Sequence, residues 1–273
     1  MSVLRYAKPL AQAAAGSRVD VCGARVLVPG PLAIRLSVVA SNIRLHRIMD
    51  TALKPGARVV DVGANIGYNT VYAARRVGIG GLVAAVEPAA DNLRVLRENV
   101  ASNGLANVAI HAVAAGRVNQ TRDLYLRGEV SAVNSLYPDS MYAAVTGTEA
   151  VRVAPLDDLV DFDADLVKID VEGAELDVLA GMPRLLRHPA LLLIVEWHPR
   201  LQEAAGFPPD ALPRTLADLG FELQAASHTR LAPLAPSEFE REAARLHFAG
   251  HPVELVARRL SPGPSGLPAP GGI

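Results

Sequence analysis

The chain has 273 residues, of which 50% are hydrophobic and 20% charged, and its formal net charge is −1. This length is sufficient for a full hydrophobic core, either as one large domain or as one domain with an extension. The near-neutral charge, the lack of a long Lys/Arg block and an aromatic content of 4% argue against a nucleic-acid-binding surface.

The cysteine content and the lengths of the apolar runs indicate the cellular compartment in which the protein is expected. The single cysteine, Cys22, excludes an internal disulfide and fits a reducing cytosol. The longest strongly apolar run covers residues 190–195, far below the roughly 20 residues that a membrane-spanning helix needs. Residues 1–16 lack the sustained apolar core of a signal peptide. We therefore expect a cytoplasmic protein without membrane or nucleic-acid partners, and the sequence leaves a homodimer open.

Residues 1–53 are predicted to form an N-terminal extension. Residues 18–22 and 25–28 flank Gly23-Ala24, a pattern that indicates a small hairpin. After a Pro-Gly-Pro break, residues 32–53 carry apolar side chains at helical spacing, which predicts one or two helices. The extension either caps the substrate side of a site or covers a sheet edge, and the sequence favours neither role.

The chain is organised around residues 57–70, where a strand, a glycine turn and a helix follow one another. The apolar run Val59-Val60-Asp61-Val62 predicts a buried parallel strand. The glycines of the turn let a ligand lie close to the backbone, and the start of a helix can bind a polar or negatively charged group. The candidate cofactor-binding residues of this stretch are Asp61, Gly63, Ala64, Asn65, Gly67, Asn69 and Thr70.

The next strand, residues 82–86, ends in Glu87-Pro88, and Glu87 lies 20 residues after Gly67. An acidic residue at about this offset, at the tip of the second strand of a nucleotide-binding fold, can accept both hydroxyls of a ribose. Asp61, just before the glycine turn, can receive an ammonium group, which a phosphate ligand does not offer. S-adenosylmethionine combines an ammonium, a carboxylate, a ribose and an adenine, and we predict it as the cofactor.

Farther along, strands and helices continue to alternate, which predicts a mostly parallel sheet with helices on both faces. A helix over residues 91–102 precedes a third strand at 108–113, and the small residues after that strand can admit the flat face of an adenine. Residues 131–138 are expected to be an ordered loop near the site. Further candidate cofactor-binding residues are Pro88, Asn92, Ala114 and Ala115.

The last part of the chain supplies the remaining strands. Residues 165–171 and 191–195 predict two more parallel strands, and residues 221–225 and 253–257 predict a terminal antiparallel pair. The predicted divisions are an extension at 1–53, a cofactor-binding domain at 54–260 and a disordered Pro/Gly-rich tail at 261–273.

Acidic residues at the strand ends are the candidate catalytic groups. Ligands of such sheets bind beyond the carboxyl ends of the strands, which places Asp61, Glu87, Asp170 and Glu196 along one rim. Lys168 and Asp170 share one face of a buried strand, where unpaired charge is costly, so these charges are expected to pair with one another or with groups of neighbouring strands. Such pairing can be purely structural and hold the rim rigid, and Asp170 is the residue that a structural role explains least well. The candidate catalytic residues are Asp170, Glu172, Glu196 and His198.

Two chemical roles are open for these four residues. His198 suits a general base by its reference pKa of about 6.5, and a carboxylate can serve if burial raises its pKa. The oxygen ligands can instead hold Mg²⁺ or another hard divalent ion. The sequence offers no tight ligand spacing, so a metal-free base is the favoured interpretation and no metal-binding residues are assigned.

Four motifs of this chain together resemble the FkbM family of S-adenosylmethionine-dependent methyltransferases. They are the runs Asp61-Val62-Gly63-Ala64-Asn65-Ile66-Gly67, Glu87-Pro88 and Lys168-Ile169-Asp170-Val171-Glu172-Gly173-Ala174-Glu175, and the single residue Glu196. The resemblance implies O-methylation of a hydroxyl, commonly on a sugar or a secondary metabolite. The motifs lie outside residues 1–53, so the resemblance says little about the substrate.

The predicted fold is a class I methyltransferase fold, which is Rossmann-like, with about seven strands in a mostly parallel sheet. The predicted reaction transfers methyl from the sulfonium of S-adenosylmethionine to a hydroxyl of a small molecule such as a glycoside. Alternatives are N-methylation of an amine and a nicotinamide-dependent oxidoreductase. Against the oxidoreductase, Asn65 replaces the second glycine of a dinucleotide fingerprint. A non-catalytic binding protein is a third alternative, opposed by the acids at all four strand ends.

Overall fold

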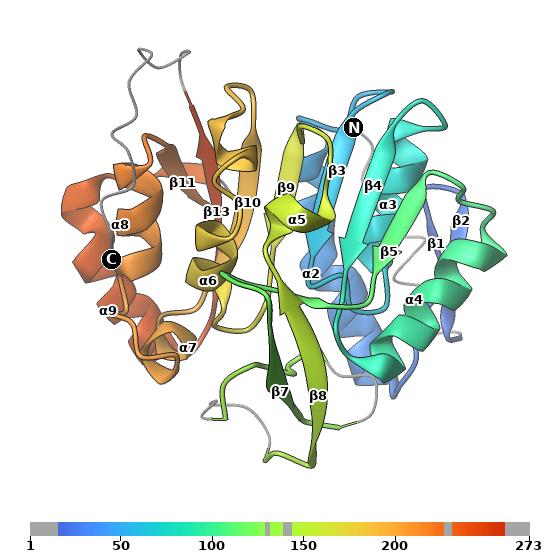
Figure 1. Cartoon of the computed structure of the whole chain (residues 1–273), viewed down its shortest axis with the longest axis horizontal. Coiled ribbons are helices and arrows are strands. Elements are labelled where there is room, and N and C mark those ends of the chain that lie inside the picture. The colour runs from blue at the N-terminus through green and yellow to red at the C-terminus, as the bar shows by residue number, and fades with distance from the viewer. Residues whose placement is uncertain (1–15, 129–131, 139–143, 227–230, 260–273) are drawn as a thin grey trace.

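An eight-stranded mixed sheet forms the centre of the molecule in the computed structural model, which describes residues 16–128, 132–138, 144–226 and 231–259 (Figure 1). The predicted tail at 261–273 lies outside the described residues. The strands run in the order β12-β11-β13-β10-β9-β3-β4-β5. Their bounds are β3 Arg58–Val62, β4 Leu82–Val86, β5 Val108–His111, β9 Leu166–Ile169, β10 Leu192–Trp197, β11 Glu222–Ala226, β12 Leu231–Pro233 and β13 Val253–Arg258.

Five strands of this sheet, β10, β9, β3, β4 and β5, are parallel to one another, and β13, β11 and β12 join antiparallel at one edge. The predicted α/β fold with a mostly parallel sheet and a terminal antiparallel pair is therefore confirmed. The sheet has eight strands rather than about seven because the short β12 pairs with β11 beyond that pair.

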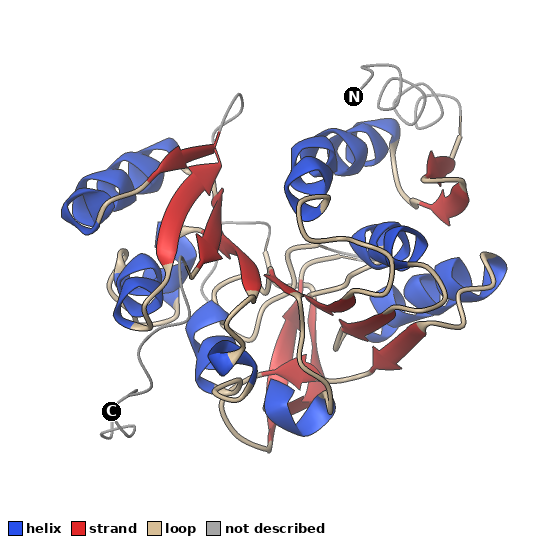
Figure 2. Cartoon of the chain, turned by 90° about the horizontal axis from the view of Figure 1, so that it is seen from above, coloured by secondary structure: helices blue, strands red, loops and turns tan. Residues whose placement is uncertain are grey.

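Helices cover both faces of the sheet, as Figure 2 shows from above. Successive residues of a strand point to opposite faces, so Val59 packs with α2 (Leu32–Met49) and α3 (Tyr68–Val77), whereas Val60 and Val62 pack on the other side. The apolar strands predicted from the sequence thus bury both of their faces. The remaining helices are α4 Ala90–Ser102, α5 Leu156–Leu159, α6 Glu175–Ala180, α7 Pro199–Ala204, α8 Ala211–Asp218 and α9 Phe239–Ala249, with 3-10 turns at Leu185–Arg187 and Pro236–Glu238.

The N-terminal extension contains the predicted hairpin, β1 (Arg18–Val21) with β2 (Ala24–Leu27), followed by the single helix α2. Asn99 of α4 ties the hairpin to the glycine turn. Its Oδ1 accepts a hydrogen bond from the Leu27 amide at 2.6 Å, and its Nδ2 donates to the carbonyls of Leu27 at 3.0 Å and Ile66 at 2.8 Å. The extension is therefore packed on the main sheet domain.

A small second sheet, in the order β6-β8-β7, extends below the main sheet in the view of Figure 1. It consists of β6 (Ala114–Ala115), β7 (Gln120–Leu126) and β8 (Gly147–Ala154). The prediction of a single strand over residues 108–113 is wrong at its end, because β5 stops at His111 and the chain then leaves the main sheet to pair β6 with β8. A change of pairing partner within an apolar run leaves no mark in the hydrophobic pattern.

Candidate functional site

A cavity of about 300 Å³ opens at the carboxyl ends of β3, β4, β9 and β10. Its wall combines the turn after β3, the tip of β4, the segment after β9 and one face of α2. Twelve of the residues predicted from the sequence line it, namely Gly63, Ala64, Asn65, Asn69, Glu87, Pro88, Asn92, Ala114, Ala115, Asp170, Glu172 and Glu196.

The glycine turn lies against the segment that follows β9. Gly63 has a φ of +76°, and a Cβ on it would lie 1.8 Å from the carbonyl oxygen of Asp170. The amides of Gly63 and Ala64 both donate to the carbonyl of Val86 at 3.0 Å, which ties the turn to the end of β4. Only glycine meets both the positive φ and the close approach, so this turn depends on Gly63.

Glu87 is buried at the tip of β4 and organises the cavity wall. Its carboxylate accepts hydrogen bonds from the Asn65 amide at 2.8 Å, the Ala89 amide at 3.0 Å and the Asn92 Nδ2 at 3.1 Å. Burial raises the pKa of Glu87 to about 7, against the lowering effect of these donors. Since a carboxylate has about four acceptor positions, the three contacts leave one position on Oε2 for a ligand.

Asp61 lies beneath the cavity, is 1% exposed, and is not among the residues that line it. Its Oδ2 accepts the Thr70 hydroxyl at 2.6 Å, and its Oδ1 is 3.9 Å from the Lys168 Nζ across the β3–β9 pair. Burial raises the pKa of Asp61 and the charge of Lys168 opposes the rise. Thr70 and Gly67 are likewise outside the lining, so these three residues support the cavity from below.

Lys168 is the only basic residue among the described residues of the cavity wall. Its Nζ is 2.9 Å from Asp170 Oδ2, the ion pair that the spacing of the two residues on one strand face allows. Burial alone would lower the pKa of Lys168, but the charges of Asp170 and Asp61 raise it, so the ammonium stays protonated. Lys168 was not among the site residues predicted from the sequence.

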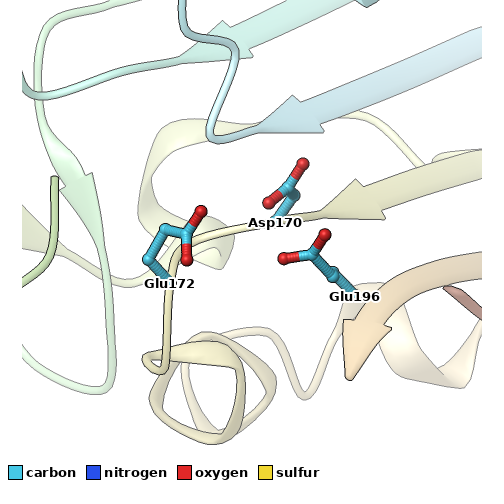
Figure 3. A group of neighbouring side chains, drawn as sticks. All are labelled: Asp170, Glu172 and Glu196. Atoms are coloured by element: carbon cyan, nitrogen blue, oxygen red, sulfur yellow. The ribbon is translucent and has the colours of Figure 1, made fainter. Parts of the chain in front are cut away.

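Three carboxylates meet at the rim beside this lysine. Ligand-capable oxygens of Asp170, Glu172 and Glu196 all lie within 4.8 Å of one another (Figure 3). Burial raises the pKa of Glu172 and of Glu196 well above the usual range, and the charge of Asp170 raises both further. Glu175, the first residue of α6, accepts hydrogen bonds from the Gly173 amide and from Gln202 Nε2 and holds the turn before that helix.

His198 is placed apart from this cluster. It precedes α7 as its N-cap residue, its side chain is buried, and it is not among the residues that line the cavity. Burial lowers the pKa of His198. The structure thus brings together three of the four candidate catalytic residues.

Two parts of the wall were not assigned residue by residue from the sequence. One is the face of α2, and the other is the loop around Asn134, within the segment that was expected near the site. The signal in α2 is a polar stripe at helical spacing within an otherwise apolar helix. The lining residues of these two parts include Ser37, Ser41, Asn42, Leu45, Asn134, Ser135 and Leu136, and Glu254 of β13 also lies in the wall.

Among the residues that the structure describes, no helix is both long enough and apolar enough to cross a membrane.

The sequence model for the family described as "Methyltransferase FkbM domain" matches residues 61–223, more than half of the chain. A protein of Beauveria bassiana named Methyltransferase 1 is 25% identical over 170 residues, which cover 55% of this chain and 68% of that protein.

Two solved structures are also similar to this chain. The FkbM methyltransferase of Methylobacillus flagellatus has a TM-score of 0.41 and 16% identity over 93% of this chain, which spans 59% of that protein's length. A putative methyltransferase of Streptococcus mutans in complex with SAH has a TM-score of 0.46 and 11% identity, with coverage of 80% of this chain and 96% of that protein.

Proposed function

This chain belongs to the FkbM methyltransferase domain family, and we propose that it transfers a methyl group from S-adenosylmethionine to a hydroxyl of a small molecule, such as a glycoside or a secondary metabolite. In this proposal residues 54–260 form the cofactor-binding domain and residues 1–53 contribute a wall of the acceptor site. The observation that carries it is the cavity that Glu87 and the Gly63 turn share with the carboxylates of Asp170 and Glu196.

The cofactor end of the proposed site is the turn after β3 and the tip of β4. The free acceptor position on Glu87 Oε2 suits one ribose hydroxyl, and the small side chains of Ala114 and Ala115 leave room for an adenine face. Asp61 would act on the ammonium of the cofactor only through water or through its effect on Lys168, because it does not line the cavity.

The acceptor end of the proposed site is the rim with the three carboxylates. In the reaction the hydroxyl oxygen forms a bond to the methyl carbon while the bond from that carbon to sulfur breaks, which leaves S-adenosylhomocysteine. The hydroxyl proton passes to a carboxylate oxygen of the rim, and proton transfer of this kind contributes typically about 10²–10⁴-fold. We assign the proton acceptor to Asp170 or Glu196 rather than to His198, since only the carboxylates line the cavity.

The wall of the acceptor end favours a polar, hydroxyl-bearing molecule. Ser37, Ser41 and Asn42 of α2 face the same cavity as Asn134 and Ser135, and hydroxyl and amide side chains can both donate to and accept from a sugar or polyol. This match supports O-methylation and is the reason for preferring a glycoside-like acceptor.

N-methylation of an amine is the second candidate, and one observation favours it. Five carboxylates and a single ammonium line the cavity within the described part of the chain, and such a field attracts a cationic acceptor. The two candidates differ in the atom that receives the methyl group.

The test is incubation of the full chain with methyl-labelled S-adenosylmethionine and paired acceptors, a glycoside and its amino-sugar analogue, followed by mass spectrometry. The proposal predicts label on oxygen of the glycoside. Label on nitrogen alone would establish the second candidate and contradict the first.

A further inference from the structure

The three rim carboxylates converge on one space. Asp170 and Glu172 follow β9, Glu196 lies in the neighbouring β10, and one oxygen of each lies within 4.8 Å of the others. Figure 3 shows the carboxylates of Glu172 and Glu196 turned toward each other, with that of Asp170 beside them. The arrangement depends on the β9–β10 pairing, which joins residues far apart in the sequence.

The charges in this space are not balanced by the protein groups that face it. Lys168 provides the single ammonium of the described cavity wall, and it is shared between Asp170 and the buried Asp61. Glu254, opposite Glu196 in the β10–β13 register, adds a further carboxylate to the wall but forms an ion pair with Arg44 of α2. Among the described residues, Glu172 and Glu196 therefore form no ion pair, and the cluster holds more carboxylates than cationic partners.

Glu172 gives an independent indication of a missing partner. The residue is only 8% exposed, and its Oε2 is buried without a hydrogen-bond donor among the described residues. A buried carboxylate oxygen without a partner is costly, and such oxygens are the preferred ligands of hard divalent cations.

We propose that Asp170, Glu172 and Glu196 together bind one hard divalent cation, Mg²⁺ or Mn²⁺, each through one carboxylate oxygen. Oxygens on opposite sides of a Mg²⁺ ion lie about 4.0–4.2 Å apart, because its bonds to oxygen are about 2.0–2.1 Å long. The three carboxylate oxygens lie within 4.8 Å of one another, so small side-chain rotations are enough to bring them to that separation. Mg²⁺ and Mn²⁺ retain water at the positions that protein ligands leave open, so an acceptor hydroxyl can replace a water on the ion.

The site revises the favoured metal-free interpretation of the sequence. The ion uses one oxygen of each carboxylate, so the second oxygens remain available to take the hydroxyl proton. Its role in polarising the acceptor rests on the proposed function, whereas its binding to the three carboxylates does not.

The test is a titration of the chelator-treated full chain with Mn²⁺, without cofactor or acceptor, followed by electron paramagnetic resonance of free Mn²⁺. Saturable binding of one ion per chain is expected. Glu172→Gln and Glu196→Gln should each weaken it at least about tenfold, because affinity follows the number of charged ligands. Mg²⁺ should displace the bound Mn²⁺. Glu203→Gln removes the same charge from an exposed site on α7 and should bind Mn²⁺ as the wild type does.

Absence of saturable binding to the wild-type chain, or equal binding by the two cluster variants and the wild type, would overturn the proposal. Circular dichroism and S-adenosylhomocysteine binding of each variant establish that it is folded. Methyl transfer that persists unchanged in EDTA would remove the catalytic role of the ion and leave the proposed function intact. Mn²⁺ binding in a chain that transfers no methyl group would support the site and count against the proposed function.

Discussion

The backbone of Gly63 lies so close to the carbonyl oxygen of Asp170 that a Cβ on Gly63 would come within 1.8 Å of that oxygen. This contact joins the proposed cofactor turn to the carboxylate cluster, because Gly63 begins the turn after β3 and Asp170 follows the neighbouring strand β9. A disturbance at either residue is therefore transmitted to the other end of the cavity.

Gly63→Ala should destabilise the fold by about 2 kcal/mol or more, since it combines a positive φ with a backbone clash. Urea unfolding measures the change. Gly147→Ala is the matched control, because a Cβ there meets nothing within 4 Å, and it should stay within about 0.5 kcal/mol of the wild type. Equal stability of the two variants would contradict the proposed packing of the turn.

Glu87→Ala should weaken S-adenosylhomocysteine binding by about one to two decades, as expected for loss of a charged hydrogen bond of about 1.5–3 kcal/mol. Isothermal titration calorimetry measures the dissociation constant. Asp91→Ala removes an exposed acid from the first turn of α4 and should leave affinity unchanged. A folded Glu87→Ala variant with wild-type affinity would refute the assignment.

Cofactor affinity should rise with pH through about 7. Burial raises the pKa of Glu87 to about 7, and only its ionised form offers the free acceptor position that we assign to a ribose hydroxyl. Below that pKa the ligand must displace a proton, so the affinity falls by up to about tenfold per pH unit. Calorimetry between pH 5.5 and 8.5 measures the slope, and Glu87→Gln should flatten it. An identical slope in that variant would assign the pH dependence to another group.

Removal of residues 1–53 should yield insoluble protein. The helix α2 buries Val39, Ile48 and Met49 in the same apolar cluster as the helix α3, and the deletion would expose that surface. Solubility on expression is the measurement. A soluble, fully active truncation would contradict both the covering role and the acceptor-wall role of the extension.

Asn42→Ala isolates the acceptor-wall role of α2. The side chain of Asn42 lines the cavity while its Nδ2 donates to the Val38 carbonyl at 2.7 Å. Loss of the Asn42 side chain should raise the acceptor KM about fivefold, because one hydrogen bond contributes about 1 kcal/mol to binding. Binding of S-adenosylhomocysteine should not weaken. Ser102→Ala on α4, outside the cavity lining, is the control. An unchanged acceptor KM in Asn42→Ala would remove Asn42 from the acceptor site.

The sheet and the part of the cavity that we assign to the cofactor were predictable because their sequence signals are local. The run that ends at Val62, the glycine turn and the offset to Glu87 lie within one strand–helix–strand unit, where periodicity and turn chemistry determine the path of the chain. The order of the strands in the sheet, by contrast, does not follow from local sequence patterns. It brings Asp61 of β3 beside Lys168 of β9, and this pairing holds Asp61 beneath the cavity while Lys168 lines it.

The proposed acceptor end was predictable only in part, because its geometry depends on strand order. The sequence placed Asp170 and Glu196 at strand ends, but their distance depends on the β9–β10 pairing. His198 follows Glu196 by two residues, yet it begins a helix and lies outside the lining. The polar face of α2 could be read as solvent-exposed until its packing over the cavity was known.

In the proposed function, the cavity binds S-adenosylmethionine through the turn at Gly63 and the carboxylate of Glu87. Calorimetric titration of the full chain with S-adenosylhomocysteine and, separately, with NAD tests it most directly. We expect saturable one-to-one binding of S-adenosylhomocysteine that Glu87→Ala weakens, and no binding of NAD. Binding of NAD in place of S-adenosylhomocysteine, or no binding of S-adenosylhomocysteine by the folded wild-type chain, would contradict it.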